Sequence, residues 1–316
     1  MRICRFRSNG VNETGFYFDD SVVPVAAAAA RLPQLPTGLE DANDHGILAL
    51  ADSPAAHALF DHLEQDPDTR DAMALPMDAV ELLAPIESPP KILLLAGNYA
   101  SHIEEEGKIA LERAETFPYL FMKPATTLNH PNAGIAIPRV SPEHIDYECE
   151  LGVVIGRRAR HVDEDAALGV VAGYTVVNDI SDRQYRPFPH RKPRERDAFF
   201  DWLHGKWHDG FCPAGPCLRS ARSLPDPQRQ RVTTHVNGEL RQDGSTAQMI
   251  FPVAAIIAFV SSLMTLEPGD IIATGTPAGV GAATGRFLKA GDRIDATIEG
   301  IGVLSNSFHD EAGEKD

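Results

Sequence analysis

The chain has 316 residues and a formal net charge of −16, because 45 acidic residues outnumber 29 basic ones. Such a charge argues against a nucleic-acid or anionic-membrane partner. The longest apolar stretch, 249–264, contains a proline and two serines and is too short for a membrane span, and the N-terminus lacks the apolar core of a signal peptide. The four cysteines form no CxxC pair and no zinc-like pattern with histidines, which favours reduced thiols and a cytoplasmic location.

The first 85 residues are expected to form a small α+β domain. Residues 1–18 predict a β-hairpin, and residues 53–65 carry apolar side chains at helical spacing. The segment 83–90 contains three prolines, which is typical of a linker. We therefore expect a second, larger domain over residues 86–316.

A continuous apolar strand is predicted at 91–96, followed by the start of a helix. Ser101 is expected to cap this helix, which would place His102 and Glu105 on one face. A histidine held by a carboxylate at this spacing can act as a general base. The competing interpretation is an ordinary helix N-terminus, where the helix dipole favours acidic residues.

The next predicted strand ends at Lys123, directly before a proline. A lysine at the end of an apolar strand is common at a protein surface. The functional alternative is a cation that pairs with a substrate carboxylate.

Three carboxylates are expected to converge farther along the chain. Glu148 and Glu150 lie two positions apart at the start of an apolar strand, so their side chains point to the same side. A second β-rich run, 172–177, ends just before Asp179. Converging carboxylates repel one another unless protons or a cation compensate them, and Mg²⁺ and Mn²⁺ prefer such oxygen ligands. Two solvated acids on an exposed strand are the alternative interpretation.

The segment 183–196 concentrates six arginines and lysines in an acidic protein. Its prolines prevent a long helix. A solvated surface loop, or a contact with an acidic neighbouring subunit, is the favoured interpretation for most of these residues. Those nearest Asp179 can instead recruit a dianionic substrate.

The C-terminal third predicts strands around the Asn-Gly turn 237–238, a buried helix after Pro252 and a strand at 271–274. The glycine-rich stretch 275–281 lacks the lysine of a P-loop and does not follow GxGxxG, so no nucleotide site is expected. Backbone contacts to an anion or oxyanion fit better. Many β-rich runs and few long helical patterns indicate a mainly β protein of the α+β class.

Six motifs follow one another from residue 91 onward. In order, they are AGNYASH, FMKPAT, DYECELGVVIGR, VVNDISDR, GKWHDGFCPAGP and LEPGDIIATGTPAGVG. Together they closely resemble the fumarylacetoacetate hydrolase family. The resemblance implies a mixed β-roll or sandwich catalytic domain over 86–316, a small N-terminal domain over 1–85, and a homodimer. It also implies Mg²⁺ or Mn²⁺ bound by Glu148, Glu150 and Asp179. The remaining site residues that it implies are catalytic His102, Glu105 and Lys206, and substrate-binding Lys123, Arg183 and Thr276.

The implied function is metal-dependent hydrolysis of a C–C bond in a small anionic 2-oxo acid of the acylpyruvate (2,4-dioxo acid) type. The reaction would pass through a metal-stabilised enolate and a water activated by His102 and Glu105. Enolate chemistry equally permits 2-oxo acid decarboxylation or keto–enol isomerisation, and a catalytically inactive metal-bound member is a further alternative. Gly97 stands where some members have a basic residue, and the connection 185–205 is longer than usual. Both departures concern the substrate and not the metal site.

Overall fold

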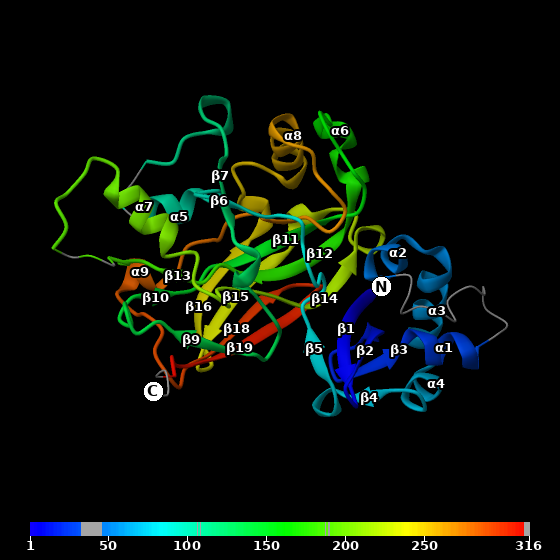
Figure 1. Ribbon diagram of the computed structural model, residues 1–316. Coiled ribbons are helices and arrows are strands. Elements are labelled where there is room, and N and C mark those ends of the chain that lie inside the picture. Colours follow the sequence, from blue (N-terminus) through cyan, green and yellow to red (C-terminus); the bar gives the residue numbers. More distant parts are fainter. Residues whose placement is uncertain (33–45, 106, 108, 187, 189, 313–316) are drawn as a thin grey trace.

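The computed structural model describes residues 1–32, 46–105, 107, 109–186, 188 and 190–312 (Figure 1). Within these ranges no helix is long and apolar enough to cross a membrane. Two β-sheets dominate the architecture, and helices are distributed around them (Figure 1). The predicted class, α+β and mainly β, is confirmed.

The larger sheet has twelve strands among the described residues. They are β1 (Arg2–Ser8), β2 (Val11–Tyr17), β3 (Ser21–Pro24), β4 (Leu75–Pro76), β5 (Glu81–Leu83), β6 (Ile92–Ala96), β7 (Tyr119–Lys123), β8 (Leu128–Asn129), β11 (Cys149–Ile155), β12 (Val171–Asn178), β14 (Cys212–Ser220) and β17 (Ile271–Ala273). Their order is β4-β3-β2-β1-β14-β12-β11-β17-β6-β7, with β5 paired to β1 and β8 paired to β14.

The smaller sheet has the strand order β16-β15-β18-β19-β9, and two further strands form a short ribbon. The sheet consists of β9 (Gly134–Ile137), β15 (Arg231–Val236), β16 (Glu239–Ser245), β18 (Arg293–Ile298) and β19 (Gly302–Asp310), and the ribbon of β10 (Ile145–Asp146) and β13 (Ser181–Asp182). The helices are α1 (Val25–Arg31), α2 (Gly46–Asp52), α3 (Pro54–Gln65), α4 (Pro67–Asp71), α5 (Ala100–Glu105), α6 (Glu164–Ala167), α7 (Asp197–His204), α8 (Val253–Leu263) and α9 (Gly281–Thr284).

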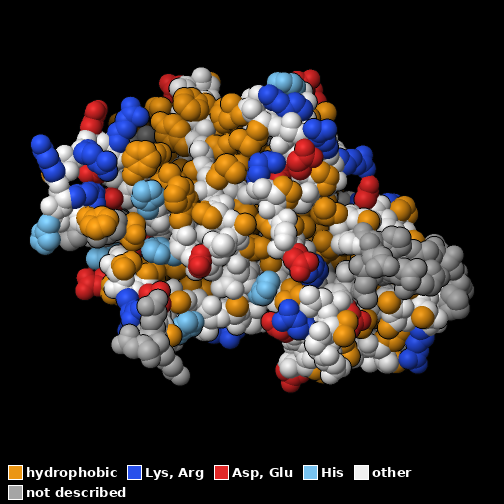
Figure 2. Space-filling model, in the orientation of Figure 1, with side chains coloured by type: hydrophobic (Ala, Val, Ile, Leu, Met, Phe, Trp, Pro, Cys, Tyr) orange, Lys and Arg blue, Asp and Glu red, His pale blue; other side chains and the backbone are white. Residues whose placement is uncertain are grey.

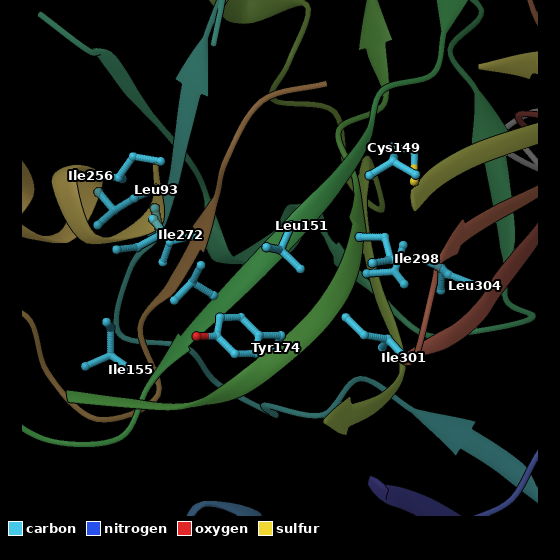
Figure 3. Close-up of a cluster of buried hydrophobic side chains, with 14 of the residues drawn as sticks. Leu93, Cys149, Leu151, Ile155, Tyr174, Ile256, Ile272, Ile298, Ile301 and Leu304 are labelled. Carbon is cyan, nitrogen blue, oxygen red and sulfur yellow. The ribbon is translucent and has the colours of Figure 1, made fainter. Parts of the chain in front are cut away.

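One face of β11 points into a hydrophobic core, and the opposite face points toward the carboxylates predicted from the sequence. Leu151, whose side chain is fully buried, belongs to a cluster that also contains Ile298 and Leu304 of the smaller sheet (Figure 3). Ile256 of α8 belongs to the same cluster. Because neighbouring residues of a strand point to opposite faces, Glu150 is directed away from this core.

The N-terminal strands continue the larger sheet. The predicted hairpin is confirmed as β1 and β2, and it turns at Asn9 and Gly10, which both have positive φ, as a tight hairpin turn requires. The helix predicted at 53–65 is α3, which Ser53 caps by accepting a hydrogen bond from the Ala56 amide. β1 pairs with β14, with Ile3 opposite Leu218. The division into domains at 85/86 stays a prediction.

The expected capping role of Ser101 is wrong, because α5 begins at Ala100 and Ser101 lies inside it. The chain is already fixed before that point. Tyr99 forms a β-bridge with Met249. The side-chain amide of Asn98 donates to the Phe251 carbonyl and accepts the Phe251 backbone N–H. The helix therefore starts directly after this anchored pair.

Candidate active site

Three buried carboxylates meet where two paired strands begin and end. Glu148 directly precedes β11 and Glu150 is its second residue, while Asp179 directly follows β12. β11 and β12 are antiparallel, with Cys149 opposite Asn178, so the start of one strand lies beside the end of the other. One oxygen from each carboxylate lies within 4.8 Å of the others. The convergence expected from the sequence is present in the structure.

Two buried lysines contact this triad. Lys206 Nζ donates to Glu148 Oε2 at 2.8 Å and to Asp179 Oδ2 at 2.6 Å. Lys123 Nζ donates to Asp179 Oδ1 and to the carbonyl oxygens of Ile180 and Phe211. An ammonium group has three protons, so these acceptors account for all the donors of Lys123.

Arg183 reaches the triad from the other side and is anchored by Asp146. Its Nη2 lies 2.6 Å from Glu148 Oε1, and its Nε donates to Asp146 Oδ2 at 2.8 Å. Asp146 is completely buried and also accepts the backbone N–H groups of Gly281 and Ala282. The sequence analysis missed this anchoring role, although Asp146 continues the alternation of Glu148 and Glu150.

Glu148 and Glu150 have opposite electrostatic environments. Burial alone would raise the pKa of Glu148, but the nearby charges of Lys206, Arg183 and His102 lower it to about 2. Burial and the charges of Asp179 and Glu148 instead raise the pKa of Glu150 well above its ordinary value. Glu150 Oε2 accepts the Gly275 N–H at 2.6 Å, whereas Oε1 is buried without a hydrogen-bond partner in the described ranges.

This donor set fits a divalent ion. Its oxygens are hard ligands of the kind that Mg²⁺ and Mn²⁺ prefer. An ion would also compensate the mutual repulsion of the carboxylates and give Glu150 Oε1 a partner. The three carboxylates can therefore hold a metal ion.

The predicted dyad lies beside the triad. His102 Nδ1 is 2.7 Å from Glu105 Oε1, and the His102 side chain is buried. Its ring is close enough to Glu148 to contribute to the lowered pKa of that carboxylate. Glu105 Oε2 in turn accepts the Gly279 N–H at 2.7 Å, so the glycine-rich loop fixes the carboxylate that orients the histidine.

The loop 275–281 supplies backbone donors, as the sequence indicates, but the acceptors are the protein's own carboxylates. The three pairs are Gly275 with Glu150, Gly279 with Glu105, and Gly281 with Asp146. Thr276 Oγ1 donates to the Cys149 carbonyl at 2.9 Å and accepts from Gln242 Nε2 at 2.8 Å. The substrate contact predicted for Thr276 stays a prediction.

Asn98 is a structural residue of the site that sequence analysis also missed. Its side-chain amide donates to the carbonyls of Phe251 and Thr274, and it ties the start of α5 to the end of β17. The pairing spans more than 150 positions, so no local pattern indicates it.

Two arginines of the basic segment 183–196 form ion pairs with acidic residues of α7. Arg191 forms ion pairs with Asp197 and Asp201, and Arg194 pairs with Asp197. Arg183, the first residue of this segment, contacts the carboxylate triad through Glu148.

The family model described as fumarylacetoacetate (FAA) hydrolase C-terminal matches residues 91–309. The bovine protein named oxaloacetate tautomerase FAHD2B, mitochondrial, is 38% identical over 282 residues, which cover 85% of this chain and 86% of that protein. The structure of fumarylacetoacetate hydrolase from Exiguobacterium antarcticum superimposes with a TM-score of 0.72 at 32% identity, covering 98% of this chain and 100% of that one.

Maleylpyruvate hydrolase from Sphingobium sp. SYK-6, solved with manganese(II) and pyruvate, superimposes with a TM-score of 0.70 at 27% identity, covering 99% of this chain and 100% of that one. The named relatives are thus enzymes of more than one reaction type. Family model, relatives and fold agree with the motifs in the sequence: the chain belongs to the fumarylacetoacetate hydrolase family.

Proposed function

We propose that this protein is a divalent-metal-dependent enzyme that hydrolyses a C–C bond of an acylpyruvate-type 2,4-dioxo acid. The observation that carries the proposal is the pair of buried His102 and half-buried Glu105 beside the three carboxylates. A base next to a metal site is what such a hydrolysis needs. A structure of similar fold, the Sphingobium maleylpyruvate hydrolase, contains manganese(II) and pyruvate, which supports this substrate class.

Glu148, Glu150 and Asp179 would hold Mg²⁺ or Mn²⁺, which when bound supplies Lewis-acid stabilisation of negative charge on the oxygens of a 2-oxo acid. The three N–H groups of Lys123 donate to Asp179 and to two carbonyl oxygens, so we propose that Lys123 orients the Asp179 carboxylate. Arg183 and Lys206 supply positive charge for the substrate's carboxylate and for the oxyanion that develops.

His102 acts as the general base in this proposal. Glu105 holds Nδ1, which orients the ring and stabilises its protonated form. The ring removes a proton from water, and the resulting hydroxide adds to the distal carbonyl carbon. The C–C bond then breaks, its electron pair leaves as the enolate of a 2-oxo acid, and His102 returns the proton to that carbon. One water is consumed, and a carboxylic acid and a 2-oxo acid are formed.

Keto–enol tautomerisation of oxaloacetate is the second candidate. It is favoured by the bovine relative of that name, which matches 85% of the chain. Here the same histidine would shift a proton between carbon and oxygen, and no bond to water would form.

The test is to incubate the protein and Mn²⁺ with a panel of acylpyruvates and with oxaloacetate. Hydrolysis yields two smaller acids that mass spectrometry detects, whereas tautomerisation changes the enol absorbance without a change of mass, and decarboxylation releases CO₂. His102→Gln should abolish hydrolysis and leave Mn²⁺ affinity within about twofold, because the histidine is not a ligand, whereas Glu148→Gln should lose the ion. Full turnover by His102→Gln would exclude the general-base role, and no turnover of any panel member would favour an inactive metal-bound protein.

A further inference from the structure

The ammonium group of Lys206 lies between two different kinds of partner. On one side it donates to Glu148 and Asp179. On the other side it lies over the rings of Phe121 and Trp202, 5.4 Å and 5.8 Å from their centroids. The two rings are themselves in edge-to-face contact, with centroids 5.0 Å apart.

This aromatic pair comes from two separate elements. Phe121 is the central residue of β7, and Trp202 lies on the last turn of α7. Lys206 is separated from the end of α7 by Gly205 alone, and its backbone N–H donates to the Leu203 carbonyl. Trp202 and Lys206 are therefore held in one local framework at the end of the connection 185–205.

Lys206 and a divalent ion compete for the same oxygens. The carboxylates that Lys206 contacts are two of the three that would hold the ion, and an ammonium group beside a dication is repelled. Lys206 has little access to water because its side chain is almost completely buried. When the ion is bound and no substrate is present, the faces of Phe121 and Trp202 are the partners that remain among the contacts of Lys206 within the described residues.

We propose that Trp202, together with Phe121, is a positioning residue that receives the Lys206 ammonium when a metal ion takes its place between the carboxylates. This inference rests on the proposed metal site. The attraction of a cation to an aromatic face is strongest where water is excluded, as it is here. Trp202 contributes more to the metal-loaded state, in which the carboxylates no longer neutralise Lys206, than to the metal-free state.

The direct test is calorimetric titration of the metal-free protein with Mn²⁺ alone. Trp202→Leu should weaken Mn²⁺ binding roughly three- to thirtyfold, the range of cation–π contacts from partly exposed to desolvated sites. Trp202→Phe keeps an aromatic face and should bind within about twofold of the wild type. Phe200→Leu is the matched control, since Phe200 is an exposed aromatic residue of the same helix, and it should leave the affinity unchanged.

A second variant separates this role from ordinary packing. In a Lys206→Met background there is no ammonium group to receive, so adding Trp202→Leu should no longer weaken Mn²⁺ binding. An equal loss in both backgrounds, or an equal loss in Phe200→Leu, would overturn the inference. Unchanged affinity in Trp202→Leu would do the same while leaving the metal site standing. If the wild type binds no Mn²⁺, the proposed function fails first and this inference fails with it.

Discussion

Glu150 differs from its two neighbours in the triad because no lysine or arginine contacts it among the described residues. Its carboxyl group is buried next to Asp179 and Glu148, so a negative charge on it raises the free energy of the metal-free fold. Gln can keep the hydrogen bond from the Gly275 N–H while removing the charge.

We predict that Glu150→Gln raises the melting temperature of the metal-free protein by about 1.5 °C, which corresponds to about 1 kcal/mol at this chain size. The same variant should lose the stabilisation that Mn²⁺ gives to the wild type, because a ligand is missing. Scanning calorimetry with and without Mn²⁺ measures both effects. Glu64→Gln, an exposed acid, controls for the general gain from reducing the net charge. A metal-free Glu150→Gln protein that melts below the wild type would contradict the prediction.

At the scale of elements, the loop 275–281 is the part of the site where backbone conformation matters most. Gly279 has a φ of 107°, and a Cβ there would lie 2.1 Å from the Arg241 carbonyl oxygen. Any side chain at this position must therefore displace the loop.

We predict that Gly279→Ala lowers kcat roughly 100-fold, the scale expected when a catalytic group is misplaced by about 1 Å. The physical reason is that the Gly279 N–H would no longer hold Glu105, so His102 would lose its orientation. Mn²⁺ affinity should change far less than kcat. Steady-state kinetics measures both quantities. Gly169→Ala is the control, because no atom lies within 4 Å of the position that its Cβ would take. Wild-type turnover by Gly279→Ala would remove the loop from the catalytic argument.

A second element-scale prediction concerns the helices that pack on β14. His57 of α3 is buried, and its Nε2 lies 3.2 Å from the Ala51 carbonyl of α2 and 3.1 Å from Ser220 Oγ of β14. Burial lowers the pKa of His57 below its ordinary value of 6.5. The unfolded chain therefore takes up this proton at a higher pH than the folded chain, and stability falls as the pH drops below about 6.5.

We predict that the free energy of unfolding of the wild type decreases more between pH 7 and pH 5 than that of His57→Gln. One residue can contribute a slope of at most about 1.4 kcal/mol per pH unit. Urea unfolding at several pH values measures the difference between the two proteins. His62→Gln, on the same helix, is the control, and identical pH slopes for wild type and His57→Gln would show that the prediction is wrong.

Local patterns predicted the parts of the site that lie within one strand or one helical turn. The period of two in β11 places Glu148 and Glu150 together, and the spacing of three in α5 joins His102 to Glu105. The remaining contacts join distant positions: Arg183 reaches Asp146 across 37 residues and Glu105 reaches Gly279 across 174. The capping of α5 was mispredicted for the same reason, since Tyr99 is fixed by Met249 and not by its neighbours.

At the scale of the whole molecule, apolar side chains gather on one face, over β7 and α8 (Figure 2). Phe117 and Tyr119 are more than 60% exposed, and Leu263 is 54% exposed. The Phe117 ring lies against Phe259 of α8. β7 ends the larger sheet, with β6 as its partner in the described part of the chain. An exposed edge strand beside an apolar surface is typical of an interaction site.

We propose that a second copy of this chain covers the surface formed by Phe117, Tyr119 and Leu263, giving the homodimer expected from the sequence. A two-fold interface buries the same patch on both copies, so one substitution weakens it twice. Phe117→Arg should therefore convert the dimer to monomer, as measured by size-exclusion chromatography with light scattering. Val11→Arg, at another exposed apolar position, should leave the dimer intact. A wild type that elutes with the mass of one chain would contradict the proposal.

The pairing of β1 with β14 has a consequence for the order in which this protein acquires its structure during synthesis. Ile3 lies opposite Leu218, so the first strand leaves the ribosome long before its partner exists. During that interval β5 can cover β1 only from Arg5 to Arg7, so the edge at Arg2 and Ile3 has no neighbour, and such edges promote aggregation of nascent chains. A ribosome-bound chain that ends before residue 212 should therefore be sensitive to protease around Arg2 and Ile3. Protection there should appear only when β14 has emerged.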